Sequence, residues 1–156
     1  MARGFNVAEQ GHVVSLFSPV SHSTAASSEV FSMEGWAHCT IILHKGVGSA
    51  STIVLEECSA FAGTGHRTFT PYKYAQEATA SGDTLDAAMA AGTTAGVAIP
   101  TGTNTFLIFE VDADALSDGY QYLRIKHNAC SASIWGAVAI LTGGRYQEDI
   151  TATAIV

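Results

Sequence analysis

The stretch Trp36–Lys45, WAHCTIILHK, alternates between two sets of side chains along its whole length. In an extended chain, successive side chains point to opposite faces of a sheet. One face of this stretch carries Trp36, His38, Thr40, Ile42 and His44, and the other carries Ala37, Cys39, Ile41, Leu43 and Lys45. This period of two predicts a β-strand. The run Ser51–Cys58, STIVLEEC, follows a glycine-containing turn, so we predict that the two runs form an antiparallel pair.

Outward from this stretch, most of the chain has the same β-type pattern. We predict further strands at His12–Ser18 (ending at Pro19), Glu29–Met33, Arg67–Tyr74, Thr105–Val111, Tyr120–His127, Ser131–Leu141 and Ile150–Val156. Pro71 favours an edge position for its strand because proline cannot donate to a ladder. Helix is limited to one or two short turns, in the alanine-rich part of Glu77–Pro100 and at Asp112–Asp118.

These strands, with turns between them, predict an all-β fold. We expect a single-domain antiparallel β-sandwich or barrel, jelly-roll-like in strand count, with at most one or two short helical turns. The expected organisation is an N-terminal arm at 1–11, a β-sandwich domain at 12–149 and a C-terminal strand or arm at 150–156.

The composition points to a protein that works through contacts. Only 13% of the 156 residues are charged, against about 25% in an ordinary soluble domain. Such a surface suits a protein packed against neighbours, although a stable monomer with a weakly charged surface is the alternative. The net charge is −7 and the seven basic residues are scattered singly, which argues against nucleic-acid binding.

The spacing of the cysteines and the lack of a targeting motif predict the cellular compartment. Cys39, Cys58 and Cys130 form no CxxC and no close pair, so we expect reduced, mostly buried thiols. The first residues resemble no signal peptide, and no apolar run approaches the roughly 18 residues of a membrane span. We therefore expect a protein made in a cytoplasm that has no membrane partner.

A search for catalytic or ligand-binding motifs finds none. GxSxG, HExxH, GxxxxGK[ST] and GxGxxG are all missing from the sequence. His38 and His44 share a face but lie about 20 Å apart along a strand, and Cys39 points the other way. Asp112, Asp114 and Asp118 fail the calcium-loop pattern because Leu116 occupies a ligand position. We expect no catalytic residue, cofactor or metal, with a loose surface Ca²⁺ site as an alternative.

Interface residues are the remaining candidates for function. Tyr120 and Tyr122 lie on the predicted exposed face of their strand, and tyrosine is enriched at protein contacts. The N-terminal arm carries Arg3 and Phe5. The C-terminal segment, with Ile150 and Ile155, is able to add a strand to the exposed edge of a neighbour. The alternative for both ends is fraying.

Five segments together resemble a known family: VFSMEGWAHCTIILHKGV (Val30–Val47), IVLEECSAFAGTG (Ile53–Gly65), YKYAQEATASGDTL (Tyr72–Leu85), FLIFEVDADALSDGYQYLRIK (Phe106–Lys126) and AILTGGRY (Ala139–Tyr146). They are similar to small structural proteins encoded among the head-morphogenesis genes of tailed phages.

The resemblance implies a β-sandwich decoration or cement protein on the exterior of the virion head. Such a protein would assemble in the host bacterial cytoplasm, bind the major capsid protein and clamp neighbouring capsid subunits together. It would form a homo-oligomer, a trimer or a dimer, and the family supplies no catalytic residues to transfer.

Two other functions stay open at the level of sequence. One is a tail or neck component of the virion. The other is a carbohydrate-binding jelly roll that attaches particles to cells, for which Tyr120 beside Asp118 is the one candidate site. A hydrolase is a more distant alternative because no nucleophile–base pair is apparent.

Overall fold

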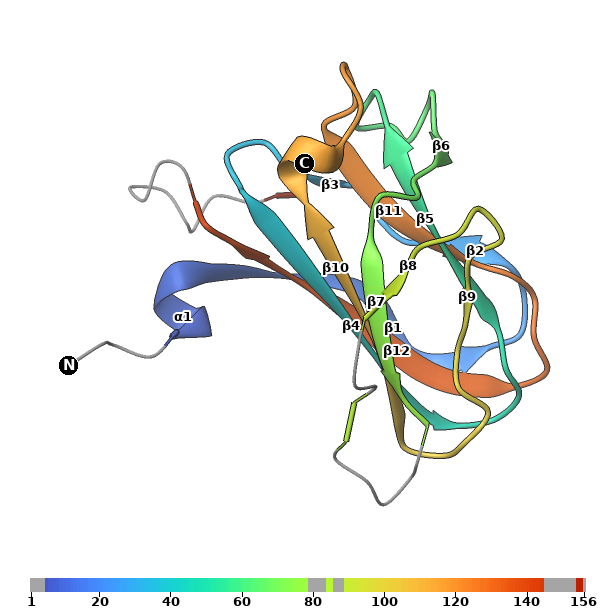
Figure 1. The fold of residues 1–156 in the computed structure, drawn as a ribbon. Helices are drawn as coiled ribbons and strands as arrows, with labels where there is room; N and C mark the ends of the chain where they lie inside the picture. The colour runs from blue at the N-terminus through green and yellow to red at the C-terminus, as the bar shows by residue number, and fades with distance from the viewer. Residues whose placement is uncertain (1–4, 79–83, 86–88, 145–153, 156) are drawn as a thin grey trace.

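The chain folds into two antiparallel β-sheets packed face to face, as the computed structural model shows (Figure 1). The structure describes residues 5–78, 84–85, 89–144 and 154–155. Sheet A has the strand order β1 (Gly11–His22), β12 (Ser133–Thr142), β4 (His38–Val47), β10 (Thr105–Asp112), β7 (Lys73–Glu77) and β8 (Ala90–Ala91). Sheet B has the order β2 (Ala26–Ser27), β11 (Tyr122–His127), β5 (Thr52–Cys58) and β6 (Arg67–Thr68), with β3 (Phe31–Ser32) on β11 and β9 (Val97–Ala98) on β5.

Helix is confined to two short elements. They are α1 (Val7–Gln10) and a 3₁₀ turn, η1 (Ala113–Ala115). The 3₁₀ turn lies where the sequence predicts a single turn within Asp112–Asp118. The prediction of an all-β, single-domain antiparallel sandwich is therefore confirmed.

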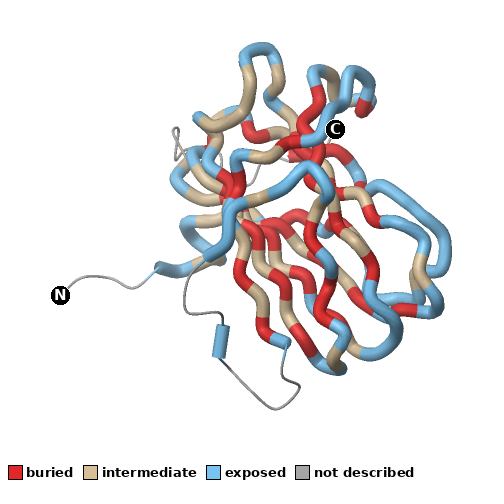
Figure 2. Tube along the Cα trace, turned by 45° about the vertical axis from the view of Figure 1, so that its right-hand side comes forward, coloured by how far each residue is buried: buried red, intermediate tan, exposed pale blue. Residues whose placement is uncertain are grey.

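The core lies between the sheets, and the alternation of the strands decides which side chains enter it (Figure 2). On β4, Cys39, Ile41 and Leu43 are fully buried, whereas the residues between them are partly exposed. Strands β10, β11 and β12 alternate in the same way. Trp36 and Trp135 both belong to this core. Trp135 lies on the buried face of β12, whereas Trp36 precedes β4 and does not follow its alternation.

The predicted pairing of Trp36–Lys45 with Ser51–Cys58 is wrong. Both edges of β4 are occupied, one by β10 and the other by β12. The chain therefore crosses after Val47 to the other sheet, where β5 pairs with β11. A short glycine-containing link permits a hairpin but does not require one. Pairing of β5 with β11 in the second sheet competes with a hairpin between β4 and β5.

The predicted end of the first strand at Pro19 is also wrong, since β1 continues through this residue to His22. Strand β1 lies at the edge of sheet A and its pairing with β12 shifts register twice, between Ser15 and Phe17 and between Phe17 and Val20. Proline is tolerated at edges and bulges because no ladder hydrogen bond is lost there. The bulge lies against Gly136, whose hydrogen faces the Pro19 backbone where a Cβ would come within 3.1 Å.

The segment Glu77–Pro100 contains two short strands, one at the end of the predicted helical stretch and one beyond it. Ala90 and Ala91 form β8, and Val97 and Ala98 form β9. The centre of the predicted helical turn, at 86–88, lies outside the described residues, as do 150–153 of the predicted C-terminal strand.

The crossing between the sheets depends on Gly48, which yields a testable prediction. Gly48 has φ of +113°, and a Cβ on it would lie 2.3 Å from the Ala132 carbonyl oxygen. Gly48→Ala therefore combines backbone strain with a clash, and we expect a loss of roughly 2 kcal/mol or more in the free energy of unfolding. Urea denaturation followed by tryptophan fluorescence measures it.

The matched control is Gly46→Ala, where the nearest atom to a new Cβ lies at an ordinary 3.6 Å. We expect this variant to unfold close to the midpoint of the original chain. Equal midpoints for the two variants would contradict the role given to Gly48.

Candidate functional site

The outer face of sheet A carries a band of β-branched apolar side chains. Ile42 on β4 lies between Ile108 on β10 and Val138 on β12, its direct partners across the two ladders. All three are half-buried on the face of sheet A that points away from sheet B. Two further residues extend the band towards the edge of the sheet: Ile140 and its partner Val13, which is 54% exposed.

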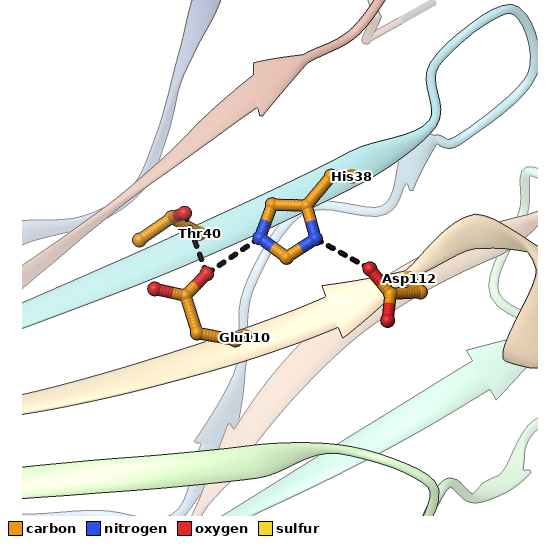
Figure 3. A network of polar contacts seen from close by, with 4 residues as sticks. All are labelled: His38, Thr40, Glu110 and Asp112. Carbon is orange, nitrogen blue, oxygen red and sulfur yellow. Dashed lines mark hydrogen bonds and ion pairs between the residues drawn. The ribbon is translucent and has the colours of Figure 1, made fainter. Parts of the chain in front are cut away.

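One end of this band is a hydrogen-bonded network between β4 and β10 (Figure 3). The His38 ring lies between two carboxylates, with Nε2 2.6 Å from Glu110 Oε2 and Nδ1 2.7 Å from Asp112 Oδ1. Thr40 Oγ1 donates to the same Glu110 oxygen at 2.7 Å. The register brings these groups together because Thr40 faces Glu110 and His38 faces Asp112 directly across the ladder.

The two carboxylates favour the doubly protonated ring, in which both nitrogens donate. Partial burial of His38 by itself lowers its pKa, but the hydrogen bonds to Asp112 and Glu110 and the charges of both groups outweigh it. The net effect is a raised pKa. His38 therefore neutralises part of the acidic end of the face and ties β4 to β10.

The other end of the band is a groove of about 280 Å³. Gly136 leaves the space open because it places no side chain between its neighbours on β1 and β4. The groove is bounded by Ser15, Phe17 and Pro19 of β1, Ile42 and His44 of β4, and Gly136, Ala137 and Val138 of β12. None of these residues is Asp, Glu, Lys or Arg and most are apolar, so this is an apolar depression.

Two further ion pairs lie in sheet B, where they join neighbouring strands. Arg124 of β11 pairs with Glu56 of β5 at 2.6 Å, with both side chains largely buried. Glu57 accepts from Arg67 at 2.6 Å and from both the backbone and the hydroxyl of Ser117. These contacts fasten β5 to its neighbours and to the loop after η1.

The predicted interface tyrosines have neighbours within the chain. The Arg67 guanidinium lies 4.2 Å from the centre of the Tyr120 ring, so one face of this ring is covered. The Tyr122 hydroxyl accepts from Gln121, and its ring contacts Phe61 edge-on.

The terminal interface residues have different surroundings. Phe5 is 60% exposed. Ile155 packs partly against the core, and its neighbour Ala154 is buried and accepts a hydrogen bond from the Ser32 amide. Arg3 and Ile150 lie outside the described residues.

Two histidines meet inside the sandwich, although the sequence shows no reason for it. His22 of β1 and His127 of β11 have ring centres 5.2 Å apart, and both contact Trp135 and Phe17. His127 is fully buried, and burial lowers its pKa. Among the described residues, no group of three or more His, Cys, Asp or Glu side chains is arranged to hold a metal ion.

The cysteines agree with the sequence prediction. Cys39 and Cys58 are buried, Cys130 is half-buried, and all three are free thiols. Within the described part of the chain, no helix is long and apolar enough to cross a membrane.

Comparison with solved structures identifies proteins of similar architecture. The SPBc2 prophage-derived protein YomS is similar to this chain with a TM-score of 0.51 and 10% identity, covering 85% of this chain and 93% of YomS. The likeness establishes the fold alone. PirA matches with a TM-score of 0.29 and 9% identity over 86% of this chain and 94% of its own.

A chain of the T13 particle of infectious bursal disease virus matches with a TM-score of 0.24 and 9% identity, over 94% of this chain and 42% of the viral chain. The TM-scores of PirA and the viral chain are too low to support an argument. No protein-family model and no curated protein matches the sequence.

The His38 network predicts a pH-dependent contribution to stability. Because the folded pKa of His38 is raised, its contribution is complete below the unfolded value of about 6.5 and is lost as the pH rises through the folded pKa. We therefore expect His38→Gln to lower the free energy of unfolding at pH 5, by on the order of 1 kcal/mol for such partly exposed pairs, and to have less effect at pH 9. Urea titrations at both pH values measure the difference.

His44→Gln is the matched control, since His44 lies on the same face of β4 and contacts Asn104 and Phe106 instead of carboxylates. An identical loss for His38→Gln at pH 5 and pH 9 would exclude the protonated ring as its source.

Proposed function

We propose that this chain is a non-enzymatic structural protein of a tailed-phage virion. In this proposal it decorates the head exterior and cements the shell by bridging major capsid subunits, after assembly in the host bacterial cytoplasm. The observation that carries the proposal is the outer face of sheet A, an apolar band flanked by polar groups whose hydrogen bonds are already made within the chain.

Removing this face from water costs little desolvation free energy. Burial of apolar surface contributes about 25 cal/mol per Å², whereas an unpaired buried carboxylate is strongly unfavourable. Here Glu110 keeps His38 and Thr40 as partners when a neighbour covers it. The face therefore has the layout of an interface, with an apolar centre and a polar margin.

The low share of charged residues supports the same conclusion. A chain with 13% charged residues has few ionic groups to desolvate when several of its surfaces are covered. The phage setting rests on the sequence resemblance to small head-associated phage proteins, and the likeness of fold to a prophage-derived protein is compatible with it.

Cementing follows from linkage. A protein that binds only the assembled shell stabilises it by mass action, since every bound copy must be released before its subunits separate. A tail or neck position is the second candidate within the virion, and the experiment below distinguishes it from a position on the head. The carbohydrate alternative loses support because Arg67 already covers one face of Tyr120.

The first experiment locates the chain in native particles. Heads and tails of the phage that encodes it are separated, and quantitative mass spectrometry gives its ratio to the major capsid protein. We expect a fixed, high ratio in heads. A few copies confined to tails would replace the cement function by the tail or neck alternative, and absence from particles would overturn the proposal.

A second experiment tests the surface. We expect Ile108→Lys to reduce binding to purified heads at least tenfold, because it places a charge within the apolar band. Val54→Lys is the matched control, since Val54 is half-buried on the outer side of sheet B. Equal binding by both variants would show that the outer face of sheet A is not the attachment surface.

A further inference from the structure

The N-terminal segment Phe5–Gln10 projects away from the sandwich (Figure 1), and its features are those of a docking arm. Helix α1 is a single turn capped by Asn6, whose side chain accepts from the Ala8 amide, and it has no buried residue. Phe5, immediately before the Asn6 cap, is 60% exposed, the largest exposed fraction among the large apolar side chains described. The arm therefore has local order without any contact that buries its aromatic ring.

The same chain offers a site of suitable size for an aromatic ring, namely the groove at Gly136. Its volume is about 280 Å³, whereas an apolar cavity of about 150 Å³ is large enough to bind benzene. Phe17 borders the groove with its backbone, because its ring lies inside the sandwich against Trp135 and His127. His44 at the margin is the aromatic neighbour that the groove offers to a second ring.

Phe5 does not reach this groove in its own chain. Gly11 pairs with Thr142, and the groove lies four to six residues further along β12, at Val138 and Gly136, which is about 13–20 Å at 3.3 Å per residue. Phe5 precedes Gly11 in the sequence, and its side chain is 60% exposed, so its ring does not occupy the groove of its own chain.

We propose that Phe5 of one copy binds in the groove at Gly136 of a second copy. Both surfaces belong to every copy, so the contact is reciprocal in a dimer or closes a ring in a trimer. The net charge of −7 on each copy opposes association in general, but the groove is lined without carboxylates, which allows close approach at this point. The inference concerns association in solution and does not depend on the virion function.

Sedimentation velocity of the full chain over a dilution series tests the proposal. We expect a reversible oligomer at concentrations up to on the order of 100 µM. Phe5→Ala should weaken association by roughly 10- to 100-fold, as expected for exposing one phenylalanine ring. Val47→Ser is the matched control, because Val47 is 49% exposed on the same sheet outside the groove lining.

A second variant examines the receiving surface without altering the arm. Ser15 is exposed at the margin of the groove, and Ser15→Phe fills the space from within the chain, so we expect a loss of association similar to that of Phe5→Ala. A chain that stays monomeric throughout, or association unchanged in both variants, would overturn the proposal.

Photocrosslinking separates contact between copies from contact within one. A benzoylphenylalanine at position 5 is introduced into ¹⁵N-labelled chain, which is mixed with unlabelled original chain and irradiated. We expect mixed-isotope crosslinks to peptides of β1 or β12 that line the groove. Crosslinks within single chains alone, or between copies at other surfaces, would contradict the assignment. These outcomes are independent of particle composition, so failure here leaves the virion proposal standing.

Discussion

The architecture depends on the burial of one strand on one face and its pairing at both edges. Strand β4 places Cys39, Ile41 and Leu43 at zero exposure in the core, while β10 and β12 satisfy its backbone on either side. A strand so placed cannot pair with the next strand in sequence, so the chain must cross to the second layer. The division into two sheets follows from this constraint.

The same constraint creates the candidate site. Because side chains alternate, the strand that fills the core with Ile41 and Leu43 presents His38, Thr40 and Ile42 on the opposite face. The neighbours of β4 then decide what these groups meet: carboxylates from β10 at one end, aliphatic side chains in the middle, and the space beside Gly136 at the other. Lys45 shows the cost of the pattern, since its ammonium is buried and is satisfied by the carbonyl oxygens of Pro100 and Gly102.

The sequence predicts the strands and their buried faces well because alternation is a local property. Leu123 and Ile125 are buried between partly exposed Arg124 and Lys126, as the pattern in Tyr120–His127 indicates. The sequence cannot predict which strands are neighbours, because pairing depends on competition between layers distant in the chain. The pairing of β4 with β5 fails for this reason, and the extension of β1 through Pro19 depends on a bulge that Gly136 permits.

The candidate site, too, is only partly predictable from the sequence. Alternation places His38 on an exposed face and spaces Glu110 and Asp112 two residues apart on one face of their strand, but only the β4–β10 register joins them. The stacking of Arg67 on Tyr120 requires a loop contact that no sequence pattern reveals.

The pairing of β1 with β12 has a consequence for synthesis in the cell. β1 leaves the ribosome before the other described strands, yet its partner is the last of them, from Ser133 to Thr142. At about 5–20 residues per second, the strand waits on the order of ten seconds for that partner. During this interval its backbone donors and acceptors are open to other nascent chains. Pro19 and the two register shifts interrupt the regular edge that such chains would otherwise extend, which protects the chain while it is being made.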